Sequence, residues 1–190
     1  MKSIWAAGAF AALLMSAVAA QAEDVTKRGG FLVRMDLEFG GDDLATVEFE
    51  SGDSQDVKAG QGITGGIGAW FRPIANKPFE LQALLGYKYV TTAADNADIS
   101  VSRVVLELDG LYRFSNDWFA SGGLTHHSSP KLDGDGFFED ISFDDATGFN
   151  IGVGWKWIAL NYTKIEYSSE FYEDVDASSI GVSFTYCFGQ

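Results

Sequence analysis

Apolar and polar residues alternate along much of this chain with a period of two. Residues 30–39 read GFLVRMDLEF, with apolar side chains at the odd positions and Arg34, Asp36 and Glu38 at even ones. Strict alternation predicts a β-strand whose two faces meet different environments. The same pattern recurs, and no helical period competes with it. We therefore expect seven further strands, at 63–71, 79–89, 103–114, 118–126, 149–157, 159–167 and 180–188.

The connections between these segments differ in length. Tight turns are predicted at 73–78, 115–117 and near Ile158. Longer polar stretches separate the other strands, at 40–61, 92–98, 128–146 and 169–177. Short connections at one end and long ones at the other are typical of an outer-membrane barrel, whose turns are periplasmic and whose loops are extracellular. The fold class predicted is all-β, an eight-stranded antiparallel up-and-down transmembrane β-barrel.

The aromatic residues indicate which face of the strands meets lipid. They gather on the apolar face beside the short turns, as Phe71, Phe79, Phe114, Trp118, Trp155 and Trp157. Such clustering resembles the aromatic girdle at a membrane interface. A lipocalin-like barrel or a soluble sandwich would instead turn its apolar face inward. We favour the membrane barrel because the apolar face is long and rich in aromatic residues.

The first residues have the pattern of an export signal. Lys2 gives a positive start, an apolar run follows as far as Ala20, and Ala20-Gln21-Ala22 precedes Glu23. This order is typical of a cleaved secretory signal peptide. As a membrane anchor the run would be short and would lack a charged stop. We expect residues 1–22 to be the signal peptide and 23–190 the barrel domain.

Composition narrows the possible partners. The 190 residues include 13 basic and 27 acidic ones, for a formal charge of −14. Such a balance argues against nucleic acid, whose phosphates need basic side chains, and against a polybasic membrane-surface binder. A single cysteine excludes an internal disulfide and a cysteine-based zinc site.

The whole pattern, ending in the alternating segment SIGVSFTYCF at 179–188, resembles the small OmpA/OmpX-like outer-membrane proteins. The resemblance implies a monomer in the bacterial outer membrane, in contact with lipid and lipopolysaccharide. It also implies assembly by the barrel-assembly machinery, which reads a terminal aromatic residue. Here Phe188 is followed by two more residues, Gly189 and Gln190.

The interior of an eight-stranded barrel is just wide enough to be filled by side chains. The polar face carries charges of both signs: Arg34, Lys88, Arg103, Arg113 and Lys156 opposite Glu38, Glu80, Glu107 and Asp109. We interpret them as a structural network of ion pairs. A narrow ion channel is the alternative. Cys187 is expected to face inward and to serve only in packing.

The acidic segment 132–145 is a candidate cation site. Asp133, Asp135 and Glu139 could offer oxygen ligands to calcium, although the full EF-hand pattern is missing. A solvated acidic loop is the preferred interpretation. We therefore expect no metal and no cofactor.

Both histidines are adjacent, and His126 with Ser128 resembles the His-x-Ser motif of outer-membrane lipid A 3-O-deacylases. The resemblance implies that His126 is the base, Ser128 the nucleophile, and Glu139 or Asp140 the orienting acid. The residue after Ser128 is serine, where that family tends to have asparagine. Our prediction is a non-enzymatic outer-membrane barrel with a structural or surface-interaction role. A lipid A deacylase-like hydrolase is the alternative, and a narrow channel the third possibility.

Overall fold

The computed structural model describes residues 28–48, 54–74, 77–91, 99–114, 117–136, 139–169 and 174–190. The predicted signal peptide and the loop 92–98 lie outside these ranges. No helix in the described ranges is long and apolar enough to cross a membrane.

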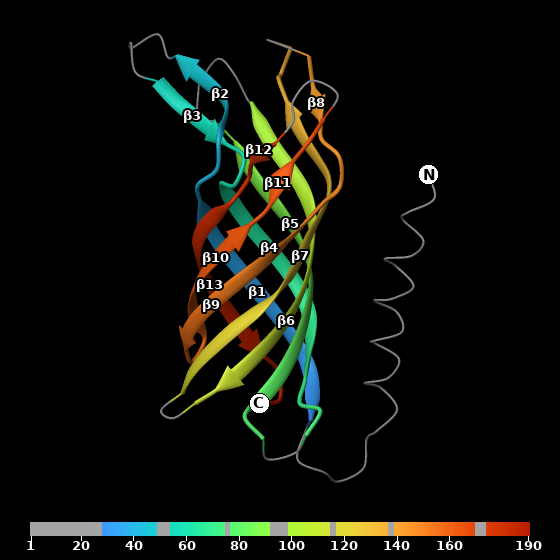
Figure 1. Ribbon diagram of the computed structural model, residues 1–190, viewed down its shortest axis with the longest axis vertical. Coiled ribbons are helices and arrows are strands. Elements are labelled where there is room, and N and C mark those ends of the chain that lie inside the picture. Colours follow the sequence, from blue (N-terminus) through green and yellow to red (C-terminus); the bar gives the residue numbers. More distant parts are fainter. Residues whose placement is uncertain are drawn as a thin grey trace, which may run out of the picture.

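Eight antiparallel strands form a closed sheet (Figure 1). They are β1 (Gly29–Phe39), β4 (Gly62–Phe71), β5 (Phe79–Thr91), β6 (Ser100–Arg113), β7 (Trp118–Asp133), β9 (Ala146–Trp155), β10 (Ile158–Lys164) and β13 (Ser179–Cys187). Each strand pairs with its neighbour in this order, and β1 pairs with β13 from Leu32↔Cys187 to Phe39↔Ile180. Closure leaves no free sheet edge. The predicted eight-stranded barrel is confirmed.

The long connections contain strands of their own. β2 (Asp43–Glu48) and β3 (Ser54–Lys58) form a hairpin, β8 (Ile141–Ser142) pairs with the upper part of β7, and β11 (Glu166–Tyr167) pairs with β12 (Val175–Asp176). The prediction of loops at 40–61, 128–146 and 169–177 was therefore too simple. These stretches look polar, but they carry single apolar residues such as Val57, Phe143 and Val175, which are buried. Figure 1 shows these additions at one end of the barrel, opposite the short turns.

The third short turn lies next to Ile158, as predicted, but the strand before it ends at Trp155 and not at Trp157. Trp155 pairs with Ile158, so the turn consists of Lys156 and Trp157, and Lys156 adopts a positive φ of 56°. Both turn residues therefore leave the alternation of the strand, and both are exposed. The prediction that Lys156 belongs to the interior network was wrong, since alternation alone extended the strand past its end.

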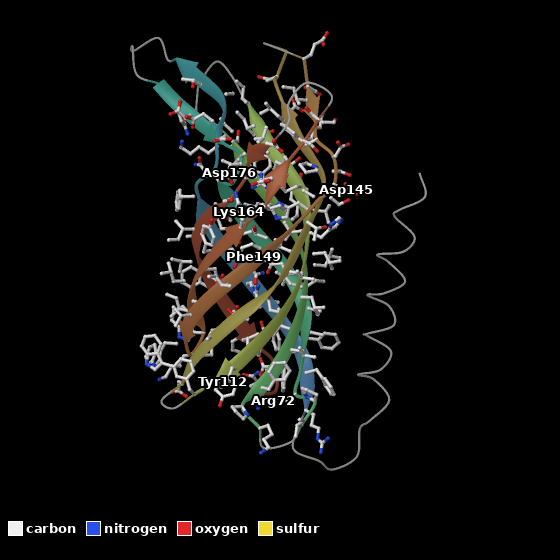
Figure 2. All side chains as sticks on the ribbon, in the orientation of Figure 1. Arg72, Tyr112, Asp145, Phe149, Lys164 and Asp176 are labelled. Atoms are coloured by element: carbon white, nitrogen blue, oxygen red, sulfur yellow. The ribbon has the colours of Figure 1, made fainter. Side chains whose placement is uncertain are left out.

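A belt of exposed apolar side chains surrounds the barrel. Along β1, Phe31, Val33 and Met35 are 66%, 41% and 46% exposed, whereas Leu32 between them is 1% exposed. Along β10, Leu160 and Tyr162 point outward and Ala159 is buried, which settles the face of that strand. All six aromatic residues of the predicted girdle are exposed near the short turns. The belt is the surface expected to meet lipid (Figure 2).

A charge placed in the middle of this belt tests its contact with lipid. Ile151, 55% exposed between Phe149 and Val153, is a suitable site. Replacing Ile151 by Arg should lower the free energy of unfolding in lipid vesicles by about 2–4 kcal/mol, because the guanidinium would enter hydrocarbon. The control Ser142→Arg, at an exposed site on β8, should change it little. Equal effects of the two substitutions would contradict a lipid-facing belt.

Candidate functional site

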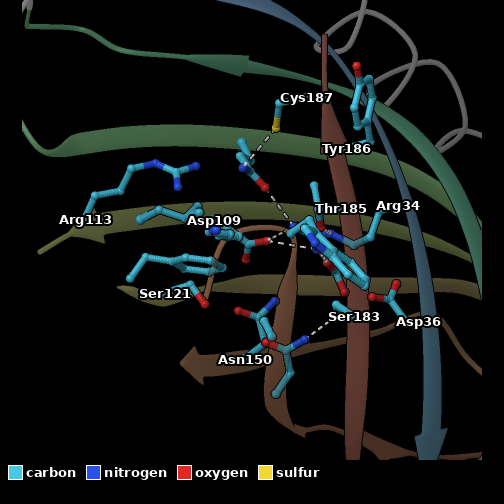
Figure 3. Close-up of a pocket in the computed structure, with 18 of the residues that line it drawn as sticks. Arg34, Asp36, Asp109, Arg113, Ser121, Asn150, Ser183, Thr185, Tyr186 and Cys187 are labelled. Atoms are coloured by element: carbon cyan, nitrogen blue, oxygen red, sulfur yellow. Dashed lines mark hydrogen bonds and ion pairs between the residues drawn. The ribbon is translucent and has the colours of Figure 1, made fainter. Parts of the chain in front are cut away.

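Charged residues gather inside the barrel, where the inward positions of neighbouring strands bring them together. The Arg34 guanidinium on β1 donates to Glu107 at 2.6 Å and to Asp109 at 3.2 Å, both on β6. It also donates to the side-chain oxygen of Gln82 at 2.9 Å (Figure 3). The three residues that hold Arg34 come from β5 and β6, across the lumen. Such charge-assisted bonds are the strong ones, provided that every partner is present.

A second pair lies nearer the long-loop end. The Lys88 ammonium, 1% exposed, lies 2.9 Å from the Glu38 carboxylate and donates to the carbonyl oxygen of Gly60 at 2.7 Å. The Ser179 hydroxyl donates to the other Glu38 oxygen at 2.7 Å. Both charges are thus compensated inside the barrel.

A third group lies at the short-turn end, where Glu80 is 1% exposed. Arg72 and Arg113 approach its two oxygens at 3.1 and 3.2 Å. The Gln190 amide donates to it at 2.8 Å, which ties the C-terminal residue to β5. Arg72 and Gln190 were missed from the sequence, because both lie just outside the alternating segments.

Arg103 does not join an ion pair with any described residue. Its guanidinium donates to the carbonyl oxygen of Gln61 at 3.1 Å and lies over the Tyr167 ring, 5.9 Å from the centroid. Its remaining nitrogens, Nε and Nη1, have no hydrogen-bond partner. Cys187 faces inward as expected and packs beside Leu32, Trp70 and Leu84.

The Arg34 and Lys88 groups together form a charged layer in the middle of the barrel. The long-loop end, above this layer, has a hydrophobic core of its own. It consists of Val57, Ala59, Ile99, Val101, Leu132, Phe143, Ala146, Ile165, Tyr167, Val175 and Ala177. Backbone bonds tie the segments together: Ala59 donates to Asp42, Asp42 to Asp176, and Ala177 to Ile165. We call this unit the apolar cap.

An open chamber of about 340 Å³ lies beside the Arg34 group and extends to the short turns. Its lining includes Arg34, Asp36 and Asp109 at one end and the turn residues Asp117 and Lys156 at the other. Glycines on β9 keep room for the side chains that line this space, because a Cβ at their positions would collide with those side chains. A Cβ at Gly152 would lie 2.2 Å from the Asn161 side chain, and one at Gly154 would lie 2.3 Å from Phe119.

The structure places the two candidate catalytic residues on the outer face of β7, with different partners. His126 Nδ1 lies 2.9 Å from the Thr147 hydroxyl. The Ser128 hydroxyl donates to Asp145 at 3.1 Å. Among the described residues, His126 and Ser128 form no hydrogen bond with each other, and neither forms one with Glu139, which is exposed. His127, the neighbour, points inward and bonds the Tyr167 hydroxyl.

A lysine directly before the acidic segment forms ion pairs with two of its carboxylates. The Lys131 ammonium lies 2.6 Å from Asp140 and 3.6 Å from Asp133. The hydrogen bond from Lys131 holds the pKa of the Asp140 carboxyl below its ordinary value and raises the pKa of Lys131. Within the described ranges, no three His, Cys, Asp or Glu side chains converge in a way that could hold a metal ion.

A closed eight-stranded barrel with an apolar belt, an aromatic girdle and a charged interior defines the class of small transmembrane β-barrels. A sequence model described as "Outer membrane protein beta-barrel domain" matches residues 10–188, so the chain belongs to that family. The resemblance to the small OmpA/OmpX-like proteins is confirmed, and the family places the protein in the bacterial outer membrane. The short turns are therefore periplasmic and the apolar cap extracellular.

Two solved structures are similar to this chain. Neisserial surface protein A has a TM-score of 0.52 at 15% identity, over 84% of this chain and 97% of that one. Ail, the attachment invasion locus protein of Yersinia pestis, has a TM-score of 0.47 at 10% identity, over 84% and 98%. No curated protein matches the sequence.

Removal of one partner from the buried Lys88–Glu38 pair tests the charged interior. Lys88→Met should lower the free energy of unfolding by about 3–5 kcal/mol, because it leaves Glu38 buried without a counter-charge. The same substitution at Lys58, whose ion pair with Asp43 is exposed, serves as the control and should have little effect. Denaturant unfolding in detergent micelles measures both, and equal losses would refute the expected difference.

Proposed function

We propose that the protein is a non-catalytic, non-conducting barrel that anchors an acidic surface outside the cell. The observation that carries this proposal is the apolar cap, a folded extracellular unit built on top of the barrel strands. A unit with its own buried core and cross-bonded backbone holds its outer side chains in a defined arrangement. Figure 2 shows Asp145 and Asp176 on this part of the molecule.

The exposed side of the cap is strongly acidic. Its exposed carboxylates are Asp42, Asp43, Asp56, Asp135, Glu139, Asp140, Asp144, Asp145, Glu166 and Asp174. The lysines there are Lys58, Lys131 and Lys164, and each already forms an ion pair with a carboxylate. The surface therefore favours a basic partner. Beside anionic lipopolysaccharide, divalent cations would bridge it to the lipid.

Two features support a closed lumen. The Arg34 and Lys88 pairs occupy the middle of the barrel, and the apolar cap covers its extracellular end. An ion entering from the periplasm would meet the ion pairs of Arg34 and Lys88, whose side chains fill the middle of the lumen, and then a layer of apolar side chains. Both layers oppose conduction.

The outer face of β7 supports a structural role for His126 and Ser128. Ester hydrolysis would need the serine oxygen within hydrogen-bond reach of the imidazole. Their bonds to Thr147 and Asp145 instead tie β7 to β9 and to the residue before it.

The proposal also includes export by residues 1–22, insertion by the barrel-assembly machinery, and a monomeric state.

A closed lumen predicts that the protein does not conduct ions across a bilayer. Purified protein in a planar lipid bilayer should show no steady single-channel steps, because paired charges and the apolar cap block the path. The double variant Lys88→Ala/Arg103→Ala, which removes two large buried side chains, provides a comparison in which leakage should rise. Stable steps from the unaltered protein would favour the channel instead.

The acidic surface predicts binding of a basic peptide. Protein in nanodiscs of neutral lipid should bind oligolysine in a manner that weakens as salt rises. The variant Glu139→Gln/Asp144→Asn should bind more weakly. The charge-preserving variant Glu139→Asp/Asp144→Glu is the matched control and should bind like the unaltered protein. Oligolysine affinity that changes neither with salt nor with the loss of these carboxylates would contradict the proposed acidic surface.

A further inference from the structure

The periplasmic chamber has the size and shape of a ligand site. Its volume of about 340 Å³ lies within the range that small-molecule pockets occupy. Figure 3 shows Arg34, Asp36 and Asp109 together with Ser183 and Thr185 around it. Because Asp117 and Lys156 belong to the short turns, the chamber opens toward the periplasm.

The inner end of the chamber carries more negative than positive charge. Asp36 is 7% exposed and forms no ion pair with a described residue, and its Oδ1 has no hydrogen-bond partner. Asp109 is 4% exposed and gives one oxygen to Arg34, while its Oδ1 is also unpartnered. Arg34 and Lys88 are both within electrostatic reach of Asp36, but Arg34 already binds Glu107 and Asp109, and Lys88 already binds Glu38. A buried carboxylate without an ion pair of its own is costly to maintain.

The chemistry of the lining favours an organic cation over a metal ion. No three acidic, histidine or cysteine side chains in the described residues converge as metal ligands, and the chamber is far larger than a bare ion. An ammonium group can donate to separate carboxylates without a fixed coordination geometry. The hydroxyls of Ser121, Ser183 and Thr185 line the remaining wall and can bond a short polar chain.

We propose that this chamber binds small periplasmic molecules through a primary ammonium group, which Asp36 and Asp109 receive. The ammonium donates to the two carboxylates and adds a positive charge to a group in which carboxylates outnumber cations. This site lies at the opposite end of the barrel from the acidic cap, so it stands or fails independently of the surface role.

A pair of probes that differ only in charge tests the proposal. 4-Amino-1-butanol carries one ammonium, and 1,4-butanediol has a hydroxyl in its place. Titration calorimetry with the full-length barrel in non-ionic detergent, at physiological salt to screen the acidic surface, measures both. We expect saturable binding of the amine at one site and no binding of the diol.

Two variants locate the site. Asp36→Asn removes the charge but breaks no ion pair, and should weaken amine binding roughly 10-fold or more. Ser121→Phe fills the chamber without a change of charge and should abolish binding. Asp174→Asn, an exposed carboxylate on the cap, is the matched control and should bind as the unaltered protein does.

Heat-modifiable mobility on a denaturing gel shows that each variant has folded. If Asp36→Asn does not fold, amine binding to Ser121→Phe and diol binding to the unaltered protein test the proposal. Binding of the diol as tight as that of the amine would overturn the proposal. Absence of amine binding to the unaltered protein would also overturn it, as would unchanged amine binding in folded Asp36→Asn or Ser121→Phe.

Discussion

Inside the hydrocarbon layer no water can bond the peptide groups, so every N–H and C=O of the barrel strands must find a partner on a neighbouring strand. The pairing of β1 with β13 satisfies this requirement, because it removes the two edges that the sheet would otherwise have. The rest of the structure depends on this closure. It turns every second residue toward lipid and confines the others to a narrow lumen.

Confinement explains the composition of the interior. A side chain that points inward is largely withdrawn from bulk solvent, so a charge there is stabilised by an opposite charge beside it. Glu80 with Arg72 and Arg113, and Glu38 with Lys88, follow this rule. The same narrowness explains glycine beside a large inward side chain of the adjacent strand, as at Gly154, which pairs with Phe119.

The two ends of the barrel are built differently. At the extracellular end the strands continue beyond the belt, and their loops fold over the lumen around the apolar cap. At the periplasmic end the turns are short, and the chamber below Arg34 remains open. This asymmetry underlies both proposals: a rigid acidic surface outside, and an ammonium site reached from the periplasm. Asp36, whose Oδ1 has no partner, distinguishes the chamber from the Lys88–Glu38 pair.

The sequence by itself determined the eight strands, their in-and-out alternation, the aromatic girdle and the unequal connections, since each follows from local periodicity and from residues near a turn. It also identified most of the interior charges. Tertiary structure alone decided the partners of those charges, because register and closure bring Arg34 opposite Glu107 across 73 residues of chain. It also placed Lys156 in a turn, and it gave His126 and Ser128 different hydrogen-bond partners. It also revealed the apolar cap and the chamber, whose residues come from distant segments and show no pattern until the barrel closes.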